Sequence, residues 1–388
     1  NSESDKFYSY GGNSSNLQKF LSSNIKDIVK TERAFCALNY DGKIMTWGHS
    51  NYGGDFHHKY DEITDIASIS SSMNAMAAIS NTGKLYTWGE YGRFHNNIWY
   101  ELTLNGYKTN ITNSSAFEAE VSSGVTDVYY NEIACIAIKD DGNGFKKICG
   151  YWGSSTTGNP EQASTGIRNH SGVLDATLLD SNIKEIFVHR STFFILKNDN
   201  KLYGWGELMD TSKINTAKLA TLIDVSSVHF TLNACAVLKT NGEVITWGTN
   251  SYGGDKADST YGVRNTSGTV QSSLLNSGSG VVSIASNLFS FCALKSDGTV
   301  LCWGHQNNGG NPYNTTEGYG MVKDMATSDM HSFVKITNTV SNKKYYCMEQ
   351  WSISTHHGFA GLRSDGAIII WGLNSAVTGV TATELKNS

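Results

Sequence analysis

The sequence has little charge, very little proline and no long apolar run. Charged residues make up 17% of its 388 residues, against roughly a quarter in average soluble proteins, and the formal net charge is −5. No basic cluster is present, so we expect no nucleic-acid partner. The two prolines, Pro160 and Pro312, exclude a proline-rich linker. No apolar segment approaches the ~20 residues that a bilayer requires, so we expect no membrane span.

Motifs of catalysis and of cofactor binding are also missing. The sequence contains no Gly-X-Ser-X-Gly, no His-Glu-X-X-His and no glycine-rich loop ending in Gly-Lys-Ser/Thr. Two histidine pairs occur, His57-His58 and His356-His357, but adjacent residues on a strand point to opposite faces and rarely bind one metal ion. We therefore expect no enzyme activity and no cofactor.

Asparagine, serine, threonine and glycine take the place of the missing charge. The chain begins at Asn1 rather than at Met, which is compatible with a removed signal peptide. Acceptor triplets for N-linked glycans, Asn-X-Ser/Thr, lie in polar surroundings. They are at Asn13, Asn110, Asn113, Asn169, Asn265 and Asn314. These observations predict a secreted or cell-surface glycoprotein, and the alternative is that so polar a chain forms the triplets by chance.

A Trp-Gly pair recurs along the whole chain. Its average spacing is about 54 residues, and a period of this size indicates a propeller or another repeat array. We predict that its tryptophans are structural and bury their indoles between neighbouring repeats. They are Trp47, Trp88, Trp152, Trp205, Trp247, Trp303 and Trp371.

Each Trp-Gly pair closes the same local pattern. "AFCALNYDGKIMTWG" (34–48) and "SFCALKSDGTVLCWG" (290–304) each contain an apolar run, an Asp-Gly turn and a β-rich run. This pattern is typical of a β-hairpin. Another short strand precedes most hairpins, and a glycine-rich loop follows most Trp-Gly pairs. We predict an all-β fold, a seven-bladed β-propeller of about 54-residue repeats.

The two chain ends predict that the propeller is closed into a ring. "YSYGGNSSN" (8–16) resembles the loop "NYGGDF" after Trp47 but has no Trp-Gly of its own, and the last repeat ends soon after Trp371. We expect residues 1–388 to form a single propeller in which residues 1–20 complete the last blade. Closure removes the exposed sheet edges that invite aggregation. An open solenoid, the alternative, usually needs capping repeats, and none is visible.

The hairpin and Trp-Gly pattern resembles the regulator-of-chromosome-condensation (RCC-type) repeat family. The family implies a seven-bladed propeller, and its members include nucleotide-exchange factors, chromatin binders, adaptor domains and a plant photoreceptor. The chain departs from the family's Gly-Gln-Leu-Gly loop: it has "YGGD" at 52–55 and 252–255 and "NGGN" at 308–311. A shared fold does not specify a function, and no family site is carried over to residues of this chain.

The cysteines include two candidate disulfides. If Asp297 and Gly298 form the turn, Cys292 and Cys302 face each other across a hairpin, at a separation that suits a bridge. Cys135 and Cys149 flank a second hairpin whose longer loop leaves the register open. We interpret Cys36 and Cys235 as buried apolar side chains.

A rigid ring with polar, variable loops predicts a structural or protein-interaction module, and self-assembly is one form of it. The longest insertions, 92–125 and 311–357, are the candidate binding surfaces. Asp55 and Asp255 are weak calcium candidates, with turn capping as the competing role. Alternative functions are an intracellular adaptor or guanine-nucleotide exchange factor of the same fold, and a glycan-binding lectin that uses aromatic residues such as Trp99 and Tyr100.

Overall fold

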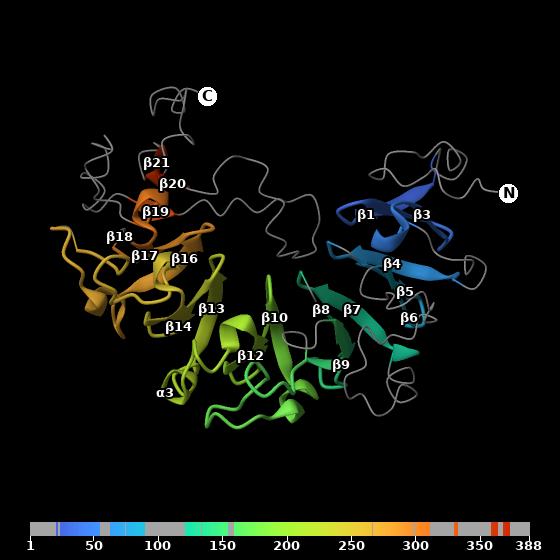
Figure 1. Ribbon diagram of the computed structural model, residues 1–388, viewed down its shortest axis with the longest axis horizontal. Coiled ribbons are helices and arrows are strands. Elements are labelled where there is room, and N and C mark those ends of the chain that lie inside the picture. The colour runs from blue at the N-terminus through green and yellow to red at the C-terminus, as the bar shows by residue number, and fades with distance from the viewer. Residues whose placement is uncertain are drawn as a thin grey trace. The chain divides into compact units, whose positions relative to one another are not determined.

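A computed structural model shows antiparallel strands and short helices in the described part of the chain, which confirms the all-β part of the predicted fold class (Figure 1). The structure describes residues 21, 24–54, 63–73, 75–89, 121–132, 134–153, 159–265, 267–297 and 299–310, together with the backbone of 330–332, 358–363 and 368–372. Two compact units are present. The first consists of 1–168, 174–198 and 204–207, and the second of 169–173, 199–203 and 208–388. No described helix has the length and apolarity to cross a membrane.

The strands form successive groups of three, and each third strand ends at one of the seven Trp-Gly pairs. We call these groups repeats 1 to 7. They are β1 (Ile25–Lys30), β2 (Ala34–Asn39) and β3 (Ile44–Gly48); β4 (Ile66–Ser71), β5 (Ala75–Ser80) and β6 (Leu85–Gly89); β7 (Val125–Tyr130), β8 (Ala134–Asp140) and β9 (Lys146–Gly153); β10 (Ile183–His189), β11 (Thr192–Lys197) and β12 (Leu202–Gly206); β13 (Val225–Phe230), β14 (Ala234–Lys239) and β15 (Val244–Gly248); β16 (Val281–Ser286), β17 (Ser290–Lys295) and β18 (Val300–Gly304); and β19 (Met330–Ser332), β20 (Gly358–Arg363) and β21 (Ile368–Gly372).

Short helices follow or connect the repeats. They are η3 (Ser50–Tyr52), η5 (Ala176–Leu179), η6 (Glu207–Met209), α3 (Thr216–Leu219), η7 (Asn250–Tyr252), η8 (Ser272–Leu275) and η9 (Gln306–Asn308).

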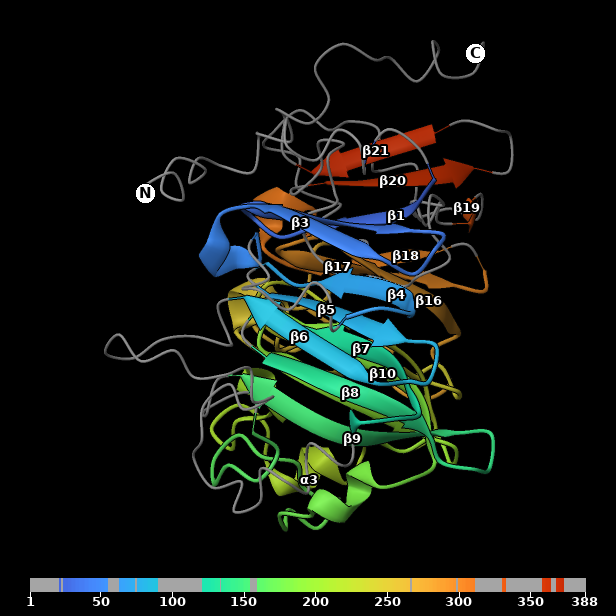
Figure 2. The ribbon, with the colours of Figure 1, turned by 90° about the vertical axis from the view of Figure 1, so that its right-hand side faces the viewer.

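Each repeat is an antiparallel sheet whose middle strand is the second one. Repeats 3 and 4 share a six-stranded sheet, in which β9 and β10 meet through the single register pair Lys146↔Ile183. Within the first unit, Figure 2 shows the sheets of repeats 1, 2 and 3 stacked in chain order. The middle strands carry nearly continuous apolar sequences, such as "AMAAIS" in β5, because both of their faces are buried.

A bulge recurs at the start of every repeat from 1 to 6. The register of the first hairpin shifts after the first strand residue, for example between Val225 and Ser227. The residue just before the strand has a positive φ, and it is Asn, Asp or Gly, the residues that tolerate the left-handed region best. These residues are Asn24, Asp65, Gly124, Asn182, Asp224 and Gly280.

The hydrophobic core lies between consecutive repeats. Ala34, Cys36 and Leu38 of repeat 1 pack in one cluster with residues of repeat 2 that include Ile69 and Trp88. Repeats 2 and 3, and repeats 5 and 6, form apolar clusters in the same arrangement. Because side chains alternate along a strand, the faces in these three clusters are of two kinds: a trailing face on the earlier repeat and a leading face on the later one.

The leading face of repeat 1 differs from those of repeats 2 to 6. Ile28, in the middle of β1, is 53% exposed. The residues at the same position in repeats 2 to 6 are between 1% and 7% exposed, and they are Ile69, Val128, Ile186, Val228 and Ile284. Phe35 and Trp47 of the same face are only partly buried. Repeat 1 therefore presents an apolar face of the kind that the described repeats cover with a neighbour.

Candidate interaction surface

The stretch "YGG" after Trp-Gly forms a tight joint. His49 and Gly53 cap η3 at its two ends, and Gly53 has a φ of 91°, which favours glycine. The chain then folds back, so that a Cβ on Gly54 would lie 2.3 Å from the carbonyl carbon of Gly48. Gly253 and Gly254 repeat this geometry after Trp247. Both glycines are therefore required by the backbone path.

The carbonyls of this joint connect two repeats. Trp88 of repeat 2 donates its indole N–H to the Gly53 carbonyl at 3.0 Å, and Trp303 donates to the Gly253 carbonyl at 3.1 Å. The preceding carbonyl, that of Tyr52, accepts the Thr31 hydroxyl of its own repeat at 2.9 Å. A buried indole N–H needs such a partner, so the joint holds the next repeat in place while it satisfies polar groups.

Other repeats vary the joint. Trp247 donates to the carbonyl of Leu208 in η6 at 2.8 Å, although no "YGG" stretch is present there. The indole nitrogen of Trp205 is buried and has no partner among the described residues. The side chains of Trp152 and Trp371 lie outside the described residues, and Trp47 is only partly buried. The predicted role between repeats is seen for Trp88 and Trp303, which belong to inter-repeat cores.

Asp255 caps a turn. Its carboxylate accepts the Ala257 backbone N–H at 2.9 Å, and its side chain lies at the surface. The described residues contain no group of three or more His, Cys, Asp or Glu side chains with metal-binding geometry. Asp55, the other calcium candidate, lies outside the described residues. The hydrogen bond of Asp255 thus shows turn capping, the role that competed with calcium binding.

Two connecting loops share a second repeated sequence that the Trp-Gly analysis missed. "GIRNHSGVLDATLLD" (166–180) precedes repeat 4, and "GVRNTSGTVQSSLLN" (262–276) precedes repeat 6. Both loops make the same backbone bonds, such as Asp175 N–H to Ile167 C=O and Gln271 N–H to Val263 C=O. A comparison of the segments between Trp-Gly pairs would have found them.

The two loops also bind the following repeat in the same way. Directly before each loop, a backbone carbonyl accepts a glycine N–H of the following repeat: that of Thr165 accepts the Gly206 N–H at 2.7 Å, and that of Tyr261 accepts the Gly304 N–H at 2.8 Å. Each loop therefore attaches to the glycine of the next Trp-Gly pair. This bond gives the glycine N–H, which lies at the end of the third strand, a partner from outside its own sheet.

Asn169 and Asn265, two of the predicted glycan acceptors, occupy equivalent positions in these loops. The Asn169 side-chain oxygen accepts the backbone N–H groups of Ser171 and Val173, and that of Asn265 accepts those of Ser267 and Thr269. Asparagine is thus favoured here by turn formation alone. Asn13, Asn110, Asn113 and Asn314 lie outside the described residues, and so does most of the candidate surfaces 92–125 and 311–357.

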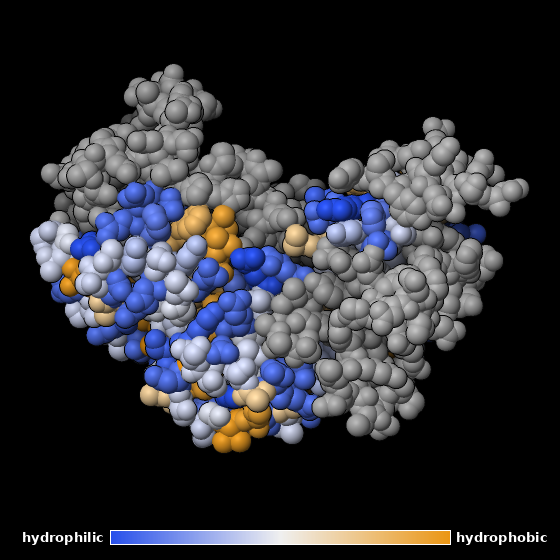
Figure 3. Space-filling view, in the orientation of Figure 1, coloured by the Kyte–Doolittle hydropathy of each residue, from blue (hydrophilic) through white to orange (hydrophobic). Residues whose placement is uncertain are grey.

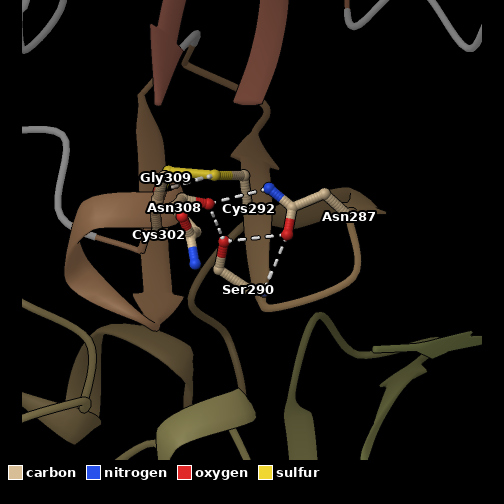
Figure 4. Close-up of a disulfide and its surroundings, with 6 residues drawn as sticks. All are labelled: Asn287, Ser290, Cys292, Cys302, Asn308 and Gly309. Carbon is tan, nitrogen blue, oxygen red and sulfur yellow. Dashed lines mark hydrogen bonds between the residues drawn. A yellow bond between two sulfur atoms is a disulfide. The ribbon is translucent and has the colours of Figure 1, made fainter. Parts of the chain in front are cut away.

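Cys292 and Cys302 form a disulfide across the β17–β18 hairpin, with their Cα atoms 4.1 Å apart (Figure 4). The joint of repeat 6 lies beside it. There, the Asn308 carbonyl accepts the Ser290 hydroxyl at 2.6 Å and the Asn287 amide at 2.8 Å. The bridge therefore connects the two strands that carry this joint.

The second candidate disulfide is not formed: no bridge joins Cys135 and Cys149, and the Cys149 thiol donates to the Ala137 carbonyl at 3.4 Å. Cys135 faces Trp152, and a bulge in β9 leaves Cys149 without a register partner. The thiols of Cys36, Cys135 and Cys235 are buried, and desolvation raises the pKa of each. They are therefore inert apolar side chains, as was predicted for Cys36 and Cys235.

The surface of the described residues is mainly polar on the face shown in Figure 3, where apolar areas are small and separate. The exposed large apolar side chains of the described residues are Ile28, Tyr40, Val173, Leu174 and Val282. Ile28 belongs to the uncovered leading face of repeat 1, whereas exposure of the others is of the kind that is normal on protein surfaces.

Comparison with known proteins confirms the resemblance to RCC-type repeats. Residues 281–309, which contain repeat 6, match the family model "Regulator of chromosome condensation (RCC1) repeat". No curated protein matches the chain.

Three solved structures illustrate what the chain is similar to. Prp20p from Saccharomyces cerevisiae is 14% identical over 73% of this chain and 72% of its own, with a TM-score of 0.34. Human WBSCR16 is 12% identical over 73% and 77%, with a TM-score of 0.36. The CRINKLY WD40 ectodomain of the Arabidopsis thaliana receptor kinase ACR4 is 13% identical over 90% and 95%, with a TM-score of 0.32. At TM-scores this low, none of them defines the whole architecture.

Proposed function

We propose that the chain is a non-enzymatic protein-interaction module of the extracellular space or cell surface, built as a closed seven-bladed propeller. The proposal rests on a contrast between recurring residues with structural roles and loops that vary. The recurring residues form joints: the indole of Trp88 and the glycines at 53 and 54 all have structural partners. Apart from the shared loops 166–180 and 262–276, the segments between the joints differ in length and sequence from repeat to repeat. Variable loops on a rigid scaffold are where recognition is usually found.

A loop exchange tests the interaction function. Replacing 92–118 by a short Gly-Ser linker should abolish capture of the native partner, or self-assembly, while the unfolding temperature changes little. The matched control replaces 141–144, the turn between β8 and β9, by a Gly-Ser turn of equal length. Partner capture that survives exchange of both 92–118 and 311–325 would contradict the proposal. Catalytic turnover by the purified protein would contradict its non-enzymatic part.

Ring closure is supported by the exposed leading face of repeat 1. β20 and β21 have the same register as β2 and β3, and Ala360 and Leu362 occupy the positions of Cys36 and Leu38. Repeat 7 therefore has the small and apolar residues that form a trailing face elsewhere. The spacing from Gly11 to Trp47 matches that from Gly53 to Trp88 within one residue. We assign Tyr10-Gly11-Gly12 as the joint that receives the Trp47 indole.

Paired substitutions test the closure. Ile284→Ala, in a buried leading face, should lower the free energy of unfolding by about 2–5 kcal/mol. In a closed ring, Ile28→Ala should lower the free energy of unfolding by a similar amount. In a chain that lacks residues 1–15, the same substitution should cost much less. The measurement is chemical denaturation followed by tryptophan fluorescence. A cost below about 0.5 kcal/mol for Ile28→Ala, the size of an ordinary surface change, would mean that the ring is open.

The extracellular location is supported by the Cys292–Cys302 disulfide, because disulfides persist mainly in oxidising compartments. Intact-mass measurement of the native protein before and after enzymatic glycan removal tests the glycoprotein assignment. Alkylation with and without reductant counts the bridged thiols. An unchanged mass together with seven alkylated thiols before reduction would place the protein in a reducing compartment.

A second candidate function is that of an intracellular adaptor or nucleotide-exchange factor, which the RCC1 repeat match favours. The structural report on Prp20p describes binding to Gsp1p and histones for that protein. The discriminating measurement is the release of labelled GDP from a panel of small GTPases. Acceleration by this chain would favour the exchange function over the extracellular module.

A further inference from the structure

Repeat 6 carries a row of four aromatic rings beside its Trp-Gly pair. Tyr252 of η7 stacks on Phe289 at 5.6 Å between ring centroids, Phe289 meets the ring of His305 at 6.1 Å, and His305 stacks on Tyr261 at 6.4 Å. The rings come from a joint, from the turn between β16 and β17, from the residue after β18 and from a connecting loop. All four side chains are partly exposed.

The backbone around this row is common to the repeats, but the side chains are not. The N–H of His305 donates to the Phe289 carbonyl at 3.1 Å, and in repeat 4 the N–H of Glu207 donates to the Ser191 carbonyl at 3.0 Å. In repeat 4 the two side chains form a hydrogen bond, from the Ser191 hydroxyl to the Glu207 carboxylate at 2.9 Å. The fold therefore does not need aromatic rings at positions 289 and 305, whereas Tyr252 also packs against the core between repeats 5 and 6.

The charged groups near the row are already engaged. The Asp258 carboxylate accepts the N–H groups of Thr260 and Tyr261 and the Asn250 amide, and these bonds hold the pKa of Asp258 below its usual value. The Arg264 guanidinium donates to the carbonyls of Ser259, Thr260 and Gly268. The row therefore offers apolar ring surface beside neutral polar groups. The exposed polar side chains there include those of Asn250, Ser259 and Thr260.

A pyranose sugar fits this chemistry. Its C–H faces are apolar and pack on aromatic rings, whereas its hydroxyls require neutral donors and acceptors at the rim. An anionic or cationic ligand would find no uncommitted counter-charge among the residues described above. We propose that the aromatic row of Tyr252, Phe289, His305 and Tyr261 is a binding site for neutral carbohydrate. This site goes beyond the proposed protein-interaction function and does not depend on ring closure.

The experiment uses the full-length protein on an array of neutral glycans, followed by calorimetric titration of the corresponding methyl glycoside. The variant combines Phe289→Ser with His305→Glu, which installs the residues that repeat 4 carries on the same backbone. Binding should fall at least tenfold. Tyr40→Ser, at a tyrosine that is 69% exposed outside the row, is the control and should bind like the unchanged protein.

Three results would overturn the site: no neutral glycan retained by the unchanged protein, equal binding by the double variant, or retention of proline-rich or arginine-rich peptides instead of glycans. Circular dichroism and the unfolding temperature of each variant separate loss of binding from loss of fold. Capture of the native protein partner is measured with the same double variant. It should persist, so failure of the carbohydrate site and failure of the interaction module give different results.

Discussion

Repeats 1 and 6 have nearly the same pattern but are buried to different extents. Phe35 and Trp47 stack with centroids 5.3 Å apart, and Phe291 and Trp303 stack at the same distance. Phe291 and Trp303 are fully buried, yet Phe35 and Trp47 are partly exposed. The cross-strand ring pair is thus a local property of the hairpin, whereas its burial requires a neighbouring repeat.

Removing the buried tryptophan should have the largest effect. Trp303→Ala deletes a fully buried indole and its bond to Gly253, and it should cost about 3–5 kcal/mol of unfolding free energy. In a closed ring Trp47→Ala should cost a comparable amount. Thermal and urea unfolding of both variants make the comparison, with Tyr40→Ala as the surface control. A loss below about 1 kcal/mol for Trp47→Ala would fit an uncovered first repeat.

The joint glycines should come next. Alanine at Gly53 or Gly253 must adopt a positive φ, which costs about 1–2 kcal/mol. A Cβ on Gly253 would lie 2.7 Å from the Phe291 ring, but a Cβ on Gly53 would meet the flexible Met76 side chain at 3.1 Å. We therefore expect Gly253→Ala to unfold at lower denaturant concentration than Gly53→Ala. The reverse order would show that the joints are not equivalent.

Exchanging the disulfide between the repeats should have a moderate effect. Cys36 faces Thr46 in repeat 1 as Cys292 faces Cys302 in repeat 6. Thr46→Cys should therefore form a bridge with Cys36 under oxidation and add about 1–2 kcal/mol, and Cys302→Thr should remove a similar amount. Alkylation followed by mass spectrometry detects the bridge. Two free thiols at 36 and 46 after oxidation would refute the shared register.

The smallest effect concerns pH. The Thr299 backbone N–H bonds to Asp297, and this and the neighbouring Lys295 lower the pKa of that carboxyl. Its contribution to stability is therefore present above the unfolded pKa of about 3.9 and is lost as pH falls through the lower folded value. Asp297 is largely exposed, so Asp297→Asn should change stability at neutral pH by less than about 0.5 kcal/mol. Between about pH 4 and pH 2, the free energy of unfolding of the variant should fall less steeply than that of the unchanged protein. An equal slope for both would show that Asp297 does not contribute to acid destabilisation.

Much of the local structure could be predicted from sequence. Alternation, Asp-Gly turns and Trp-Gly pairs predict the hairpins, and the register arithmetic across the turn at Asp297 places Cys292 opposite Cys302. The same reasoning failed at Cys149, because a bulge in β9 depends on backbone bonding that the residues around it do not indicate. The connecting loops were missed because their shared sequence lies between the Trp-Gly pairs and occurs in only two of the connections.

The sequence of "TWGTNSYGGD" (246–255) determines by itself that the chain must turn, because Gly248 and Gly253 both have positive φ and glycine alone adopts it without strain. The sequence also determines which side chains can pair across a hairpin, since register is fixed within a few residues. Only the tertiary structure decided what the turn is for: its Gly253 carbonyl receives an indole N–H from fifty residues further along the chain. It also decided that Phe289, His305 and the two tyrosines meet, because contacts between repeats depend on packing that local sequence does not encode.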